Sequence, residues 1–161
     1  MVGLTRDPAR TTLLHELGAE AAVADAYDRE SLIRVVVDAQ PEVVVNFLTD
    51  LAARSSELNA RIRREVGPSV VAAAQESSAK RIVVESVAWP LEGASADALS
   101  ILESGALGSG LSALVIRFGR LWGPGTWYAE PPEPPHVEIS EAAFRAADLI
   151  TAESTGIEVV A

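Results

Sequence analysis

The side chains in this chain that could do chemistry stand at or just after the ends of short apolar runs. They are Asn46, Thr49 and Asp50 after one run, Ser86 and Trp89 after the next, and Arg120, Trp122 and Tyr128 after a third. The carboxyl ends of parallel strands meet at one edge of a sheet, and ligands of such folds bind there. We therefore expect a small-molecule site with Ser86, Asp50 and Arg120 as reactive groups and the other five residues as substrate-binding groups. A guanidinium in this place could pair with a carboxylate or phosphate. For Trp122, simple packing over the sheet edge is an equally good interpretation.

The elements that must position these residues follow from the alternation of short apolar runs with longer helical patterns. This alternation is typical of strand–helix units that build a parallel sheet between helical layers, a Rossmann-like α/β fold. We expect a single domain over residues 1–161, because no linker separates two cores. The expected strands are 2–5, 21–24, 43–48, 81–85, 113–118 and 157–160. The expected helices begin after the capping residues Asp7 and Asp28 and cover 51–66, 69–77, 97–107 and 140–152.

Two local features refine this pattern. The nearly all-apolar run Val43–Leu48 is typical of a strand covered by helices on both faces. The proline-rich segment Ala129–Pro135 is incompatible with a helix or a central strand, so we expect an extended connector there.

Composition narrows the class of protein. The chain has 13 basic and 23 acidic residues and a formal net charge of −10, which disfavours nucleic acid and anionic membrane surfaces as partners. The absence of cysteine excludes disulfides and thiolate chemistry, and the two histidines, His15 and His136, show no metal-ligand spacing, so we expect no metal site. No apolar run approaches the roughly 20 residues of a membrane span. A cytoplasmic protein is therefore expected.

One stretch of the sequence resembles a known enzyme family. Leu114–Gly125, LVIRFGRLWGPG, is similar to the sixth strand and following loop of extended and atypical short-chain dehydrogenases/reductases, the NAD-dependent epimerase/dehydratase group. The segments KRIVVESVAW, PEVVVNFLTD and VGLTRDPA continue this resemblance in the family's order. The resemblance implies a nucleotide-binding sheet, and it places Ser86 at the family's Ser/Thr position beside the substrate.

The chain departs from that family at its beginning. Family members start with a strand, a glycine-rich turn and a helix that hold the cofactor pyrophosphate, whereas this sequence contains neither GxGxxG nor GxxGxxG. The chain is thus interpreted as an N-terminally truncated relative that starts one strand too late. Three arrangements could fill the gap between the strands at 2–5 and 43–48. The two strands pair directly, a strand from another chain enters, or the gene product is longer.

Cofactor and catalytic positions are also altered. By resemblance, Arg6 matches a basic residue that contacts the ribose phosphate of NADP, and Asp25 matches an acidic residue that bonds the adenine amine. The alternatives are a solvated loop charge for Arg6 and a turn residue for Asp25. The family's Tyr-x-x-x-Lys pair is missing, since the only tyrosines are Tyr27 and Tyr128 and the only lysine is Lys80. We therefore expect no cofactor, or NADP or NAD if the family site survives.

Three functions remain open. The first is a degenerate member of this fold that binds a small metabolite or catalyses a non-redox step, namely isomerisation, dehydration or cyclisation. The second is an NAD(P)-dependent epimerase or reductase whose N-terminal cofactor unit is absent from these residues. The third is a non-catalytic interaction protein. The family resemblance also implies a homodimer that packs through the 51–66 helix.

Overall fold

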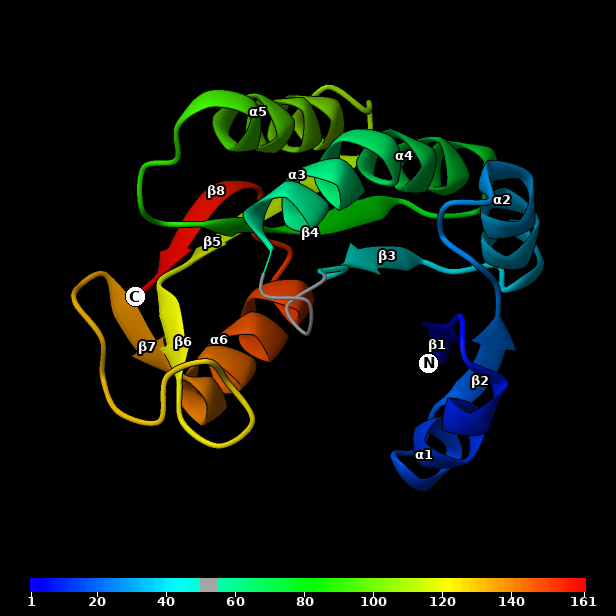
Figure 1. The fold of residues 1–161 in the computed structure, drawn as a ribbon. Coiled ribbons are helices and arrows are strands. Elements are labelled where there is room, and N and C mark those ends of the chain that lie inside the picture. The colour runs from blue at the N-terminus through cyan, green and yellow to red at the C-terminus, as the bar shows by residue number, and fades with distance from the viewer. Residues whose placement is uncertain (50–54) are drawn as a thin grey trace.

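The computed structural model describes residues 1–49 and 55–161 and consists of parallel strands with helices on either side (Figure 1). The eight strands of these residues are β1 (Val2–Thr5), β2 (Glu20–Val23), β3 (Val43–Asn46), β4 (Arg81–Val87), β5 (Ser112–Phe118), β6 (Arg120–Trp122), β7 (His136–Glu138) and β8 (Gly156–Val160). The helices are α1 (Thr11–Glu16), α2 (Arg29–Asp38), α3 (Ser56–Glu65), α4 (Gly67–Glu76), α5 (Gly93–Leu107) and α6 (Ile139–Thr151), and a 3-10 turn at Pro8–Arg10 precedes α1.

The strands form three separate parallel sheets. β1 pairs with β2, β6 pairs with β7, and the main sheet has the order β3-β4-β5-β8. Every pairing between these strands is parallel. β1 and β3 are not paired with each other, so direct pairing, one of the three arrangements considered for the gap, is wrong. The other two arrangements for this gap stay open.

Local sequence signals fix the helix starts. Asp7 accepts a hydrogen bond from the Ala9 amide and Asp28 from the Ser31 amide, as expected of N-cap residues. Gly18 ends the first helical segment with a φ of 79°, a conformation that glycine adopts without strain. The start of the helix expected at 51–66 falls partly outside the described residues, and α3 begins at Ser56.

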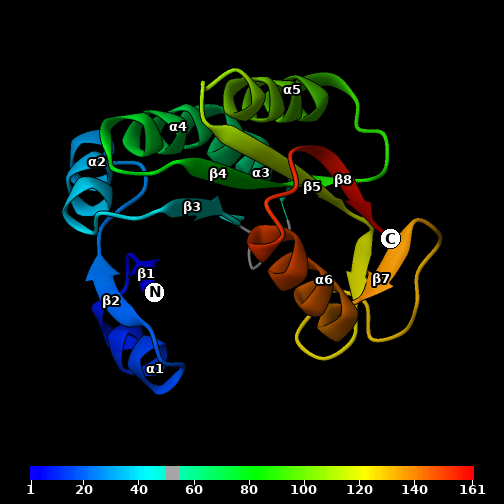
Figure 2. The ribbon, with the colours of Figure 1, turned by 180° about the vertical axis from the view of Figure 1, so that it is seen from behind.

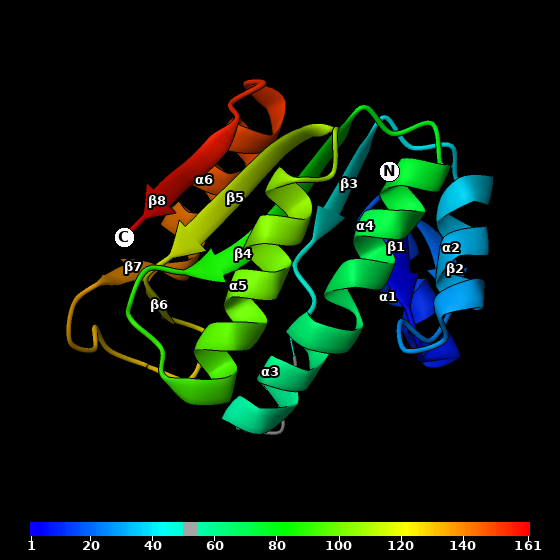
Figure 3. The same cartoon turned by 90° about the horizontal axis from the view of Figure 1, so that it is seen from above.

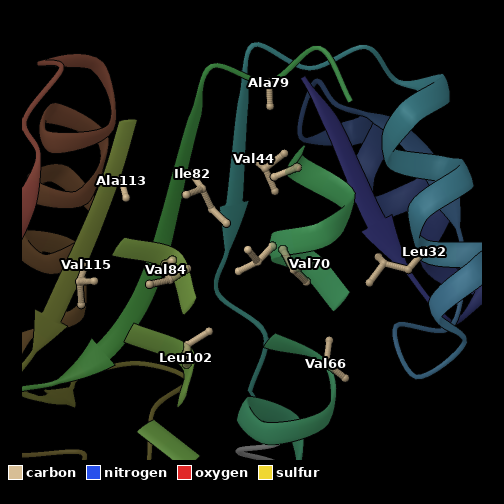
Figure 4. Packing of buried hydrophobic residues seen from close by; sticks show 13 residues of the cluster. Leu32, Val44, Val66, Val70, Ala79, Ile82, Val84, Leu102, Ala113 and Val115 are labelled. Atoms are coloured by element: carbon tan, nitrogen blue, oxygen red, sulfur yellow. The ribbon is translucent and has the colours of Figure 1, made fainter. Parts of the chain in front are cut away.

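Two apolar clusters lie on opposite faces of the main sheet. The larger one lies under α2, α4 and α5 and contains Leu32, Val44, Val70, Ile82 and Leu102 (Figure 4). The smaller one lies under α6 and contains Val83, Leu114, Ile116, Ala146 and Val160. Figure 3 shows α3 and α4 following one another end to end, with α5 beside them, across one face of the sheet. The expected α/β fold with helical layers is thus confirmed.

The structure differs from the expectation at β3. Val44 and Asn46 are buried, whereas Val45 is 43% exposed and Phe47 is 41% exposed. α1 and α6 lie on the side of the sheet opposite α4 and α5, at its two ends (Figures 1 and 2). The helices of residues 1–49 and 55–161 therefore cover one face of β3 and leave Val45 exposed on the other, so the prediction of cover on both faces is wrong.

The connector at residues 129–135 has neither helix nor strand, as expected. The short strands β6 and β7 on either side of it lack a long apolar run, so the sequence did not indicate them. None of the helices within residues 1–49 and 55–161 is both long enough and apolar enough to cross a membrane.

Candidate functional site

A first cavity of about 400 Å³ lies where β1, β2 and β3 end, and we call it the β1–β3 cavity. Its wall includes three residues predicted from the sequence, Arg6, Asp25 and Thr49. The other lining residues are Leu4, Thr5, Asp7, Arg10, Ala24, Ala26, Tyr27, Leu48, Ile62 and Val66. The structure therefore brings together residues from three strand ends and from α3, as ligand sites of parallel sheets require.

The polar groups of this cavity differ in the contacts that they make within the protein. The Asp25 carboxylate accepts a hydrogen bond from the Tyr27 amide at 3.0 Å, which makes Asp25 a turn residue. Arg6 is exposed just beyond β1. The Tyr27 ring lies 4.8 Å from the Arg61 guanidinium carbon, an arrangement that favours a cation–π contact. Arg6, which is exposed, thus lines the same cavity as Tyr27 and several apolar side chains.

A second cavity of about 440 Å³ lies between the loop after β4 and helix α5, and we call it the β4–α5 cavity. The predicted residue Trp89 lines it, together with Glu103 and Arg117. Its remaining lining residues are Val87, Ala88, Pro90, Leu91, Ala96, Leu99, Ser100 and Val159. Its wall therefore combines an ion pair with an indole ring and aliphatic side chains.

Ser86, Glu103 and Arg117 form one hydrogen-bonded cluster beside this second cavity. The Ser86 hydroxyl donates to the Glu103 carboxylate at 2.5 Å. The Arg117 guanidinium donates to both carboxylate oxygens of Glu103, at 2.9 and 2.6 Å. Burial by itself would raise the pKa of Glu103, but the hydrogen bonds from Arg117 and Ser86 and the positive charges of Arg117 and Arg63 lower it overall. Glu103 is consequently held as a carboxylate, a hydrogen-bond acceptor.

Ser86 itself is fully buried, with no exposed surface. It lies at the end of β4, as predicted, but its hydroxyl proton points to Glu103. Ser86 lines neither of the two cavities.

A second ion pair lies close to the first. Arg63 of α3 donates to Glu85 of β4 at 3.0 Å, and the two side chains are only 10% and 14% exposed. Burial raises the pKa of the Glu85 carboxyl above its usual value, although the charge and hydrogen bond of Arg63 act in the opposite direction. This pair links α3, which lines the β1–β3 cavity, to the strand that carries Ser86.

Arg120 makes structural contacts within the protein. Its guanidinium donates to the carbonyl oxygens of Glu133 and Pro134, both at 3.2 Å, and its Cζ atom lies 4.9 Å from the centre of the Trp89 ring. Arg120 therefore fixes the 129–135 connector and stacks on a wall residue of the β4–α5 cavity.

Of the remaining predicted residues, Asn46, Trp122 and Tyr128 do not line either of these cavities. Trp122 forms an isolated backbone bridge with Tyr128 in the loop after β6. The buried Asn46 side chain accepts from the Leu48 amide at 3.2 Å and shapes the end of β3. Asp50 lies outside the described residues. No group of three or more His, Cys, Asp or Glu side chains within residues 1–49 and 55–161 is arranged to hold a metal ion.

The sequence analysis did not identify the partners in the two ion pairs. The structure pairs Arg117 of β5 with Glu103 of α5. The pair of Arg63 and Glu85 was not anticipated. The available signal was a charge inside each of two otherwise apolar strands, Glu85 in β4 and Arg117 in β5.

Comparison with known proteins gives one relative with a similar sequence and many solved structures with a similar fold. A 3-diazoavenalumate denitrifying reductase from Streptomyces sp. is 35% identical over 135 aligned positions, which cover 66% of this chain and 44% of the reductase. No protein-family profile matches the chain.

Among solved structures, the Bordetella bronchiseptica enzyme WbmH in complex with NAD⁺ superposes with a TM-score of 0.76 at 17% identity, over 98% of this chain and 65% of WbmH. BdcA in complex with NADPH gives 0.69 at 20% identity, over 99% of this chain and 80% of BdcA. A dTDP-glucose 4,6-dehydratase from Streptomyces venezuelae, DesIV, with NAD bound, gives 0.75 at 14% identity, over 99% of this chain and 65% of DesIV. The chain thus spans less than half of the reductase and about two thirds of WbmH and DesIV.

Proposed function

Because the chain has the fold of NAD-dependent epimerase/dehydratase-type short-chain dehydrogenases/reductases, we propose that it is the nucleotide-facing part of an NAD(P)-linked reductase of small metabolites. The observation that carries this proposal is the β1–β3 cavity, which collects an exposed guanidinium and an aromatic ring at the strand ends. The sequence likeness to a reductase supports the same activity.

The described residues fit one end of a dinucleotide better than the other. Arg6 would pair with a ribose phosphate, and Tyr27, Leu48 and Ile62 would contact the adenine ring. A diphosphate requires closely spaced backbone amides, and no glycine-rich turn is present in the sequence to supply them. When bound, the cofactor would supply a hydride, and the residues of this chain would bind its adenosine end.

The β4–α5 cavity is proposed as the metabolite site. Glu103 is neutralised by Arg117, so Arg120 above Trp89 contributes a positive charge to this region. An anionic metabolite with an apolar body therefore matches the wall better than a cationic one. Because α5 carries no tyrosine or lysine, this chain would not use a tyrosine–lysine proton relay.

Binding of adenosine 2′,5′-bisphosphate to the full chain tests the nucleotide part by titration calorimetry. We expect saturable binding that Arg6→Ala weakens by about tenfold, because a charge-assisted hydrogen bond is lost. Arg34→Ala is the matched control, since Arg34 is an exposed arginine of α2 outside the cavity. Absence of heat at millimolar ligand, or equal binding by the Arg6→Ala variant, would count against the proposal.

A specific observation favours a second candidate, metabolite binding or a non-redox step. The Glu103–Ser86–Arg117 cluster lies where α5 faces the strand ends, and its carboxylate can accept a hydrogen bond from a polar group of a bound metabolite. Screening of anionic metabolites for thermal stabilisation, with and without NADPH, separates the two candidates. Stabilisation that does not depend on NADPH, together with no consumption of NADPH, favours the non-redox function.

A further inference from the structure

Arg117 is bound to Glu103 through only part of its guanidinium group. Its Nε and Nη2 atoms donate to the two carboxylate oxygens, at 2.9 and 2.6 Å. A guanidinium also carries two N–H groups on Nη1 and a second one on Nη2, and these have no partner within residues 1–49 and 55–161. The Arg117 side chain is 38% exposed and lines the β4–α5 cavity. Arg117 therefore keeps donors for a second acceptor.

The guanidinium of Arg117 is also held in place. Ser86 of β4 is the register partner of Arg117 on β5, and the Ser86 hydroxyl donates to the Glu103 carboxylate that Arg117 binds. Hydrogen bonds from both strands therefore fix Glu103, and Glu103 in turn fixes Arg117. A side chain that is already ordered loses less conformational entropy when a ligand binds.

The wall of the cavity beside Arg117 is apolar. Val159 of β8 is the other register partner of Arg117, is 52% exposed, and lines the same cavity. Figure 3 shows α5 lying over β4, with no helix of the described residues over β8. Trp89, Leu91 and Leu99 add further apolar surface. The volume of about 440 Å³ is within the range of about 300–1,000 Å³ for small-molecule sites, so a small apolar body has room there.

We propose that the free edge of the Arg117 guanidinium binds the carboxylate of a small monocarboxylic acid, whose apolar body lies against Val159 and Trp89. This inference rests on the proposal that the β4–α5 cavity is the metabolite site, and it names the class of ligand. The parallel N–H groups of Nη1 and Nη2 match the two oxygens of a carboxylate. The Glu103 charge on the adjacent edge disfavours a phosphate dianion, because like charges close to one guanidinium repel each other.

Arg120 is not the anchor in this arrangement. It does not line the β4–α5 cavity, and its Nη1 atom donates to the carbonyl oxygens of Glu133 and Pro134. Its positive charge attracts an anion without a direct contact. Loss of the Arg120 charge should therefore weaken binding less than loss of the Arg117 charge.

Titration calorimetry of the full chain with matched ligands tests the proposal. The probes are 3-phenylpropanoate, its amide 3-phenylpropanamide, and 2-phenylethyl phosphate, which is a dianion above its second pKa of about 6. We expect saturable 1:1 binding of 3-phenylpropanoate, with the amide and the phosphate weaker by about tenfold or more. Absence of saturable 3-phenylpropanoate binding at millimolar concentration, or equal binding of the amide, would overturn the proposal.

Variants of the chain locate the bound carboxylate. The double variant Glu103→Gln/Arg117→Gln replaces the ion pair with two neutral amides that can hydrogen-bond to each other, so it leaves no unpaired buried charge. Its affinity for 3-phenylpropanoate should fall by about tenfold or more. Arg34→Gln, at an exposed arginine of α2, is the matched control and should not change the affinity. A greater loss in Arg120→Ala than in the double variant would place the anion at Arg120 and refute the assignment.

The single variant Glu103→Gln gives a second readout that does not depend on the double variant. It keeps the Arg117 guanidinium and removes the neighbouring negative charge. The preference for 3-phenylpropanoate over 2-phenylethyl phosphate should then fall from about tenfold to about equal binding. If circular dichroism shows that the double variant does not fold, this change decides the question, and an unchanged preference would contradict the proposal.

The result is separable from that of the nucleotide proposal. If the chain binds adenosine 2′,5′-bisphosphate and does not bind 3-phenylpropanoate, the carboxylate site alone is refuted. If it binds 3-phenylpropanoate and does not bind the bisphosphate, the nucleotide proposal is refuted and the carboxylate site is supported.

Discussion

Glu103 and Arg117 are joined by two hydrogen bonds, at 2.9 and 2.6 Å, with the Ser86 hydroxyl as a third donor to the same carboxylate. The pair ties α5 to the end of β5. Because its guanidinium is 38% exposed and its carboxylate 12% exposed, solvent screens the arginine in part.

Removal of the Glu103 charge should destabilise the protein. We expect Glu103→Gln to lower the free energy of unfolding by about 1–2 kcal/mol, since Arg117 and Ser86 lose a charged acceptor. Glu65→Gln, which breaks the exposed pair of Glu65 with Arg61, should cost about 0.5 kcal/mol or less. Urea denaturation at neutral pH measures both values, and an equal loss in the two variants would contradict the structural role of Glu103.

The same carboxylate should make stability depend on pH. The pKa of Glu103 is lowered in the folded state, so its contribution is present above the unfolded-state pKa and is lost as pH falls through the folded-state pKa. The stability advantage of the wild type over Glu103→Gln should therefore shrink on acidification. Denaturation midpoints of both proteins from neutral to acidic pH provide the measurement, and an advantage that does not change with pH would refute the assignment.

Glu85 should behave in the opposite way. Its pKa is raised in the folded state because burial outweighs the attraction of Arg63. Its contribution is thus fully present below the unfolded-state pKa and is lost as pH rises through the folded-state value. Relative to Glu85→Gln, the wild type should gain stability as pH falls. The same pH series on Glu85→Gln tests this, with Glu141→Gln on α6 as an exposed control.

Gly119 should not tolerate a side chain. A Cβ atom at this position would lie 2.9 Å from the backbone of His136, where β6 and β7 begin to pair. We expect Gly119→Ala to cost about 1–3 kcal/mol through backbone displacement. Gly105→Ala in α5 is the contrasting variant. Its nearest neighbour is Val71 at 3.9 Å, so it should stabilise the helix by about 0.5–1 kcal/mol. Thermal melts of the two variants should shift in opposite directions.

Arg120 should hold the proline-rich connector in place. Arg120→Ala removes the hydrogen bonds to the Glu133 and Pro134 carbonyls and the contact with Trp89. We expect faster proteolytic cleavage within residues 129–135, because the segment loses its anchor. Arg34→Ala supplies the control rate. Cleavage at an unchanged rate would show that the connector is held by other contacts.

Much of the fold could be predicted from the sequence because its signals are local. Apolar runs indicate β4 and β5, and Asp7 and Asp28 indicate helix starts through hydrogen bonds to nearby amides. The uncovered face of β3 could not be predicted, because an apolar run such as Val43–Leu48 has the same composition whether one or both faces are covered. Whether a face of β3 is covered depends on helices that are distant from it in the sequence.

The candidate site was predictable only in part. The ends of the strands locate Arg6, Asp25 and Thr49 at one cavity, since parallel strands end at a common edge. The partner of each buried charge was harder to identify. The pairing of Arg63 with Glu85 joins residues 22 positions apart and depends on how α3 lies relative to β4. No spacing rule in the sequence encodes this packing.

Ile62 and Arg63 are neighbours in α3 and make different contacts. Ile62 lines the β1–β3 cavity, whereas Arg63 is bonded to Glu85, the residue next to Ser86. A molecule that displaces this helix on entering the first cavity would have to stretch a desolvated ion pair. Ligand binding at one cavity would then be coupled to ligand binding at the other through the Arg63–Glu85 pair. Thermodynamic linkage requires the coupling free energy to be the same in both directions.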